Sequence, residues 1–209
     1  MSGNWRQGGW FYDLGLMGNR QTTDMHSRPK AEEYLDTAME ALATGDVCHS
    51  LLDRLPVPIY TTDADGAVTY WNRACVDFAG REPQLGEDRW CVTWMIFTTS
   101  GDRLPHDQCP MAQAIREQRE IRGAVAIAMR PDGSRRAFTP YPTPLFDDDG
   151  KLRGAVNMLI DVSAEQAEVL AEQAQRCRRL ANATYDRKTC SVLAAMADEF
   201  AKTADDLSH

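Results

Sequence analysis

The sequence predicts an α+β fold in which a five-stranded antiparallel sheet carries helices on one face. Three tight turns support this prediction, because Asp65-Gly66, Asp132-Gly133 and Asp149-Gly150 each separate two β-favouring segments. Helical patterns lie between the first turn and the last two, so those helices are expected to cover one face. A chain of 209 residues suits one good core with helical extensions.

The N-terminal part divides into an arm and two short helices. Residues 1–30 show no long period, and we expect a flexible arm whose aromatic residues could dock onto the body or onto a second subunit. In residues 31–55 the apolar residues recur every three to five positions, with a break at Gly45 and Asp46. This spacing predicts two short amphipathic cap helices.

The first strand pair is expected over residues 58–71, where Gly66 can adopt the positive φ of a tight hairpin. Asn72 follows directly and is predicted to cap a helix over residues 73–79 with its side chain. Residues 90–97 resemble a buried strand. Pro110 can begin a helix without losing a hydrogen bond, which predicts a helix over residues 110–119.

Three further strands are predicted over residues 123–130, 135–145 and 152–162. Short turns link them in order, so they must form an antiparallel meander, and the earlier hairpin completes the sheet.

The tail carries two apolar seams separated by a break at residues 182–186. Each seam must be buried against the other helix, a second subunit or a partner. The spacing of three and four residues recurs in both helices, at Ala167, Leu170, Ala174, Cys177 and Ala181 and again at Leu193, Met196, Phe200, Thr203 and Leu207.

The order of these segments resembles the PAS family. The resemblance is carried by LPVPIYTTDADG at 55–66, VTYWNRA at 68–74, RPDGSRR at 130–136, PLFDDDG at 144–150 and GAVNMLIDVS at 154–163. It implies a domain over residues 56–162 with a sensory role, followed by a helical hairpin or coiled-coil tail over residues 163–209. Because PAS domains often dimerise through flanking helices, the resemblance also implies a homodimer.

A second stretch, Trp90-Cys91 with LPHDQCPM at 104–111, resembles the PAS domains that precede bacterial sensor histidine kinases of the HWE type. Only residues 164–209 follow Ser163, and they hold no Gly-rich phosphate loop. We therefore expect a sensor domain detached from its output enzyme, with a partner protein in a signalling pathway.

Composition excludes several functions. The net charge of −8 repels nucleic acids and anionic membrane surfaces. No segment reaches the apolar length of a membrane span, and no signal peptide is evident, so a cytoplasmic location is expected. The sequence shows no Ser/His/Asp set and no HExxH motif, and the six cysteines form no close pairs, so neither catalytic residues nor a metal site is predicted.

A PAS sheet and its helices enclose a cavity, so a small-molecule ligand is a candidate for this chain. The alternative is that the same residues form a filled hydrophobic core. The candidate pocket residues are Tyr60, Trp90, Trp94, Met111, Ile115, Met129, Tyr141 and Met158.

No cofactor is required by the sequence, and two are considered. Haem could be ligated by Cys109 or His106, although Cys109 simply precedes a helix that begins at Pro110. Flavin is another PAS cofactor, but the cysteines at 75 and 91 do not match the Asn-Cys-Arg-Phe-Leu-Gln run of light-sensing members.

Two functions follow. In the first, the core binds a ligand or partner, and the junction Asp161-Val162-Ser163 passes the change to the tail, with Asp161 acting as a cap or hinge. In the second, the chain is a constitutive protein-interaction adaptor with a filled core, which binds a partner through residues 163–207.

Overall fold

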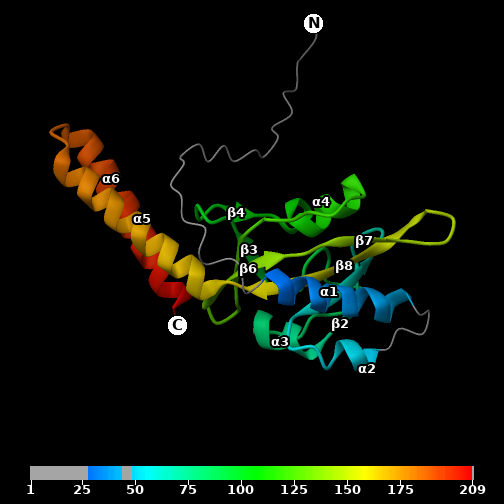
Figure 1. The fold of residues 1–209 in the computed structure, drawn as a ribbon. Coiled ribbons are helices and arrows are strands. Elements are labelled where there is room, and N and C mark those ends of the chain that lie inside the picture. Colours follow the sequence, from blue (N-terminus) through cyan, green and yellow to red (C-terminus); the bar gives the residue numbers. More distant parts are fainter. Residues whose placement is uncertain (1–27, 44–48, 209) are drawn as a thin grey trace, which may run out of the picture.

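The computed structural model describes residues 28–43 and 49–208 (Figure 1). The aromatic residues of the predicted arm lie outside this range. The elements run in the order α1 (Arg28–Ala43), α2 (His49–Leu52), β1 (Ile59–Asp63), β2 (Val68–Trp71), α3 (Arg73–Ala79), β3 (Met95–Phe97), β4 (Arg103–Leu104), the 3-10 helix η1 (His106–Gln108), α4 (Pro110–Glu117), β5 (Ala126–Met129), β6 (Arg135–Pro140), β7 (Thr143–Phe146), β8 (Leu152–Asp161), α5 (Ser163–Ala183) and α6 (Arg187–Leu207).

The strands form one antiparallel sheet, which confirms the predicted fold class. Its order is β2-β1-β8-β6-β5-β3-β4, and β7 pairs with β8 beyond the end of β6. The first hairpin and the closing meander therefore meet where β1 pairs with β8. This makes β8 a central strand with ladders on both edges.

Two predicted strands differ in extent from those observed. The segment 135–145 is broken into β6 and β7, because Pro140 and Pro142 lack the N–H that a continuous ladder needs. The segment 90–97 is extended only over Met95–Phe97, since Trp90 adopts a positive φ of 68°. A short β4 pairs with β3, so the sheet has eight strand segments rather than five.

Helices cover both faces of the sheet. As predicted, α3 and α4 lie over one face, where the largest apolar cluster includes Tyr60, Met111 and Phe138. The opposite face is covered in two places: α1 packs on Ile59 and Met158, while α5 and α6 pack on the residues of β5 and β6. The face covered by α3 and α4 is called the α4 face below.

The tail forms a hairpin that projects away from the sheet (Figure 1). The two seams face each other within the chain, and the break falls at residues 184–186. Met196 is the exception to the predicted seam of α6: it is 40% exposed, and the neighbouring Ala197 is fully buried instead. Asp186 caps α6 by accepting a hydrogen bond from Thr189 N at 2.8 Å. The half of the hairpin nearest the junction packs on the sheet, through Leu170 of α5 and through Phe200 and Leu207 of α6.

Asn72 corrects one prediction. It is the residue before α3, but its side chain makes no cap hydrogen bond. Instead its Oδ1 accepts from Ile59 N at 3.0 Å, and its Nδ2 donates to the carbonyls of Leu52 and Val57. The fully buried amide therefore fastens the segment before β1 to the end of β2.

Within the described part of the chain, no helix combines the length and the apolar character needed to cross a bilayer.

Candidate functional site

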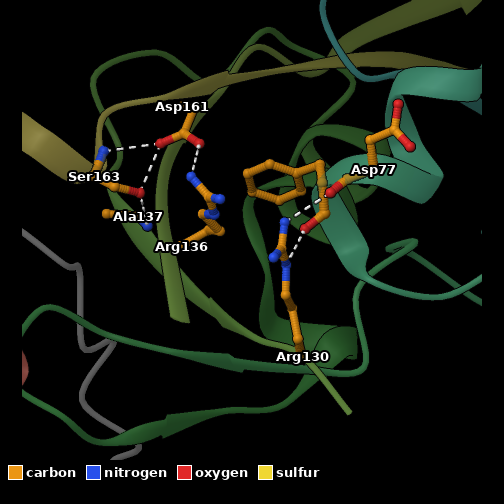
Figure 2. A network of polar contacts seen from close by, with 7 residues as sticks. Asp77, Arg130, Arg136, Ala137, Asp161 and Ser163 are labelled. Carbon is orange, nitrogen blue, oxygen red and sulfur yellow. Dashed lines mark hydrogen bonds and ion pairs between the residues drawn. The ribbon is translucent and has the colours of Figure 1, made fainter. Parts of the chain in front are cut away.

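The junction between β8 and α5 is built from side chains that the sequence singled out (Figure 2). Asp161 is the last residue of β8, and its Oδ1 accepts from Ser163 N at 2.9 Å and from Ser163 Oγ at 2.6 Å. Its Oδ2 accepts from Arg136 Nη1 at 3.3 Å. A short carboxylate side chain two residues before a backbone N–H commonly forms such a turn.

The same junction is fastened to the neighbouring strand β6. Ser163 Oγ accepts from Ala137 N at 3.0 Å, and Val162 N donates to Ala137 O at 2.9 Å. Both backbone groups of Ala137 are thereby used by the junction. The first turn of α5 is held to the sheet by hydrogen bonds as well as by packing.

A second contact in Figure 2 links α3 to Arg130, the residue that follows β5. Arg130 donates through Nε to Phe78 O at 2.8 Å and through Nη2 to Asp77 O at 2.7 Å. A guanidinium at the C-terminal end of a helix satisfies carbonyls that have no partner within the helix and interacts favourably with its dipole. The sequence offered no local signal for this contact, since the residues are more than 50 positions apart.

On the α4 face, a buried chain of hydrogen bonds connects β1 to β8. Tyr60 donates its hydroxyl hydrogen to Trp90 O at 3.0 Å, and Asn157 Nδ2 donates to Tyr60 Oη at 2.9 Å. Asn157 Oδ1 in turn accepts from Tyr141 N at 3.0 Å. Asn157 was not among the predicted site residues, because nothing in its local sequence shows that it lies opposite Tyr60.

The residues around Tyr60 keep their protons. Burial raises the pKa of Tyr60 well above its ordinary value, and Cys91 and Cys109 add to this shift. Burial likewise raises the pKa of Cys91, and it raises the pKa of Cys109 to about 12. The site around Tyr60 is therefore uncharged at neutral pH.

The eight predicted pocket residues do not form one group. Tyr60, Met111 and Ile115 are buried together on the α4 face, with Trp90 packed against them. Met158 and Tyr141 belong to the cluster under α1, on the other face. Met129 is half-buried at the end of β5, and Trp94 is 45% exposed.

Three buried polar atoms have no hydrogen-bond partner in the described structure, namely Thr62 Oγ1, Trp71 Nε1 and His106 Nε2. Thr62 and Trp71 pair across their strands with residues of the α4-face cluster, so both lie on that face. A buried polar group normally has a partner. On the α4 face, Thr62 Oγ1 and Trp71 Nε1 are therefore groups to which a polar ligand or water could form hydrogen bonds.

The two candidate haem ligands differ in their chemistry. Cys109 donates its thiol hydrogen to Trp90 O at 3.8 Å, and burial raises its pKa to about 12, so this thiol is protonated at neutral pH. Burial lowers the pKa of His106, so its ring stays neutral, which is the form that ligates a metal. Among the described residues, no group of three or more His, Cys, Asp or Glu side chains is placed to hold a metal ion.

An open groove of about 850 Å³ lies beside the junction, between the start of α5 and the end of α6. Asp161 and Ser163 contribute to its wall, so a change at the junction would alter the groove. Its other lining residues include Arg136, Glu165, Glu168, Ala171, Ala201 and Asp205.

Comparison with known proteins gives a family match and several similar folds. The family model described as PAS fold matches residues 52–167. No curated protein matches the chain in sequence.

Among solved structures, the chain is similar to the LOV domain of a blue-light activated histidine kinase from Erythrobacter litoralis, with 23% identity over 52% of this chain and 98% of that one, at a TM-score of 0.40. The PAS domain of BvgS from Bordetella pertussis shows 20% identity over 57% and 85% of the two chains, at a TM-score of 0.38. The LOV protein of Rhodobacter sphaeroides shows 13% identity over 83% and 96%, at a TM-score of 0.43.

Proposed function

The chain belongs to the PAS family, as the match over more than half its length shows, and from this premise we propose that it is a signalling module. In this proposal a small ligand binds on the α4 face, and the hairpin of α5 and α6 carries the response to a partner protein. The observation that carries the proposal is that one strand, β8, contributes both Asn157 at the buried site and Asp161 at the junction.

The ligand position is supported by the unpaired polar atoms. Thr62 Oγ1 and Trp71 Nε1 lie on the same face as Tyr60, and a ligand with one hydrogen-bond acceptor and one polar edge would satisfy both. The hydroxyl can donate or accept, whereas the indole nitrogen only donates. Burial of these groups without a partner costs roughly 1–3 kcal/mol each, which ligand binding would recover.

The geometry of β8 supports the proposed relay. Residues 157, 159 and 161 share one face of the strand, because side chains alternate along it. A ligand that displaced Tyr60 would break its hydrogen bond with Asn157 and shift β8 relative to β6. This movement of β8 would displace Asp161 and Ser163, which hold the first turn of α5.

For the assembly, we propose a homodimer formed through the helical hairpin. Its support is that α5 and α6 leave several large apolar side chains exposed, among them Val169, Leu180, Val192 and Met196. Exposed apolar groups of this kind mark interaction surfaces when they are contiguous.

The test is a native mass spectrum and an absorption spectrum of freshly purified full-length protein, with two variants. The expected result is a mass above that of the bare chain, which Thr62→Val lowers to the bare-chain value. Thr61→Val is the matched control, because Thr61 lies on the opposite face and its hydroxyl already bonds to Thr69 at 2.8 Å. A haem or flavin would also appear in the absorption spectrum, and haem bound through His106 would be lost in His106→Ala.

A bare-chain mass for the native protein, with unchanged thermal stability across a library of small polar molecules, would overturn the ligand proposal. That outcome would favour a constitutive adaptor with a filled core.

A further inference from the structure

The groove beside the junction is formed by one stripe of residues from each helix of the hairpin. Within each stripe the residues are four and three positions apart, so they follow one side of their helix. The two stripes are Ala164, Glu168 and Ala171 on α5 and Ala201, Asp205 and Ser208 on α6. Each stripe extends over seven residues, and an α-helix rises 1.5 Å per residue, so the groove is about 10 Å long.

An ion pair marks each end of this groove. At the inner end Arg136 Nη1 lies 3.3 Å from Asp161 Oδ2, and both residues belong to the wall (Figure 2). At the outer end Arg178 Nη2 lies 3.6 Å from Asp198 Oδ1 and bridges α5 and α6. Arg178 and Asp198 each lie seven positions from a groove residue of their own helix, so the bridge is on the same side of the hairpin. The groove thus spans about two helical turns between the two ion pairs.

The groove has an apolar floor and acidic walls. Its charged residues are four carboxylates and one guanidinium, and the guanidinium of Arg136 already pairs with Asp161. Glu165 and Glu168 are exposed on the α5 side. The apolar residues are mostly alanines, whose side chains end at Cβ and so leave space for larger side chains of a partner: Ala164, Ala167, Ala171, Ala201 and Ala204.

The shape of the groove favours a helix over a small molecule. Small-molecule pockets enclose most of their ligand, whereas this groove is open along one side. An amphipathic helix needs only its apolar face covered, and such helices bind grooves through anchors spaced three and four residues apart. Two turns of a helix place three such anchors over a length of about 10 Å.

We propose that the groove binds a basic amphipathic helix of a partner protein. Two or three large apolar side chains of that helix pack on the alanines, and Lys or Arg residues on its flanks face Glu165 and Glu168 of α5. Complementary charge selects the partner, because an acidic helix would be repelled by the same walls. The inference rests on the signalling function proposed above and adds the surface and the chemistry of the partner.

The position of the groove couples this partner to the ligand site. Asp161 and Ser163 form its inner wall and also hold the first turn of α5 to the sheet. A movement of β8 that displaced these two residues would change the width of the groove at its inner end. Partner affinity would therefore depend on the state of the α4 face.

The first experiment measures binding of synthetic peptides to the full chain by fluorescence anisotropy. The probe is a peptide of about 15 residues in which a stripe of Leu is flanked on both sides by Lys, with Ala elsewhere, a length sufficient for a helix. It is expected to bind at least about tenfold more tightly than a peptide with Glu in place of every Lys. It should also bind at least about tenfold more tightly than a peptide with Ser in place of every Leu. Equal binding of either control peptide overturns the proposal.

The second experiment locates the bound peptide by filling the groove. Ala171→Phe is expected to weaken binding of the Lys peptide at least about tenfold, and the fold should tolerate it because Ala171 is exposed. Ala195→Phe is the matched control: Ala195 is also an exposed helical alanine, but it lies about 120° around α6 from Ala201. Equal affinities of the two variants would place the peptide elsewhere and overturn the proposal.

The third experiment reverses the charge of one wall. The double variant Glu165→Lys/Glu168→Lys is expected to lose affinity for the Lys peptide and to gain affinity for the Glu peptide. Glu82→Lys/Glu87→Lys changes the net charge by the same amount at exposed positions before β3, and it should bind the Lys peptide like the native chain. Equal losses in the two double variants would show attraction to net charge alone and overturn the groove.

The peptide experiments and the native mass spectrum can fail independently. A native chain that carries a ligand but does not bind the Lys peptide overturns the groove and retains the ligand proposal. A bare chain that binds the Lys peptide in the groove retains the docking surface and overturns the ligand proposal.

Discussion

The Ser163 hydroxyl lies 2.6 Å from Asp161 Oδ1, and it serves two partners at once. It donates its hydrogen to the carboxylate and accepts the backbone hydrogen of Ala137 at 3.0 Å. One side chain thereby joins the end of β8, the start of α5 and the middle of β6. The position is 6% exposed, so water does not readily replace these bonds.

Replacing Ser163 by Ala should destabilise the protein, because the buried Ala137 N–H would lose its acceptor. The expected loss in the free energy of unfolding is about 1–3 kcal/mol, measured by urea denaturation. Ser134→Ala is the matched control: its hydroxyl also donates to a carboxylate two residues earlier, Asp132, but in an exposed turn. Equal losses in the two variants would contradict the role assigned to the junction.

The Tyr60–Asn157 bond should show energetic coupling. Tyr60→Phe removes the partner of Asn157 Nδ2 and leaves Trp90 O with only the bond from the Cys109 thiol, so it is expected to cost about 1–3 kcal/mol. In a cycle with Asn157→Ala, the two losses should be non-additive by at least about 0.5 kcal/mol. Tyr70→Phe, which removes an exposed hydrogen bond to Asp53, should cost less than Tyr60→Phe. Additive losses would show that the two side chains do not act together.

Gly66 should tolerate substitution poorly for two separable reasons. Its φ is +86°, which disfavours any residue with a Cβ, and a Cβ at this position would overlap the ring of Trp90. Gly133 has nearly the same φ, +87°, but nothing lies near the place its Cβ would occupy. Thermal denaturation should therefore show Gly66→Ala to be less stable than Gly133→Ala by about 1–3 kcal/mol. Similar melting temperatures would refute the contact with Trp90.

The free energy of unfolding should decrease at alkaline pH, because the buried Cys109 thiol keeps its proton only in the folded state. Because burial raises the pKa of Cys109 from 9.0 to about 12, the folded state holds the proton that the unfolded state releases. This contribution is fully present below about pH 9 and is lost as the pH rises towards 12. Urea denaturation across this range should show a shallower decline in Cys109→Ala than in the native protein; an unchanged slope would count against the assignment.

The three hairpin turns, the strands beside them and α4 could largely be predicted from local sequence, whereas β4 was missed. The pairs Asp65-Gly66 and Asp132-Gly133 provide the backbone freedom that tight turns need, and Pro110 fits the first position of a helix. Both effects act over a few residues, so no knowledge of distant contacts was required.

The composition of the site could not be predicted in the same way. Strand alternation shows that Met158 and Leu159 point to opposite faces, but it does not show which face lies under α4. Asn72 has the sequence signal of a helix cap, yet its partners are 13 to 20 residues away. Arg130 and Asn157 likewise depend on contacts between distant segments, which only the folded chain brings together.

Because the hairpin is long, a small rotation at the junction produces a larger displacement at its far end. Each helix has 21 residues and is therefore about 30 Å long, and the residues that pack on the sheet lie in the half of the hairpin nearest the junction. A rotation of about 10° around Val162 would swing the far end by roughly 5 Å, about the rise of one helical turn. The hairpin thus acts as a lever arm, in which a displacement too small to disturb the core becomes large enough at the tip for another protein to detect.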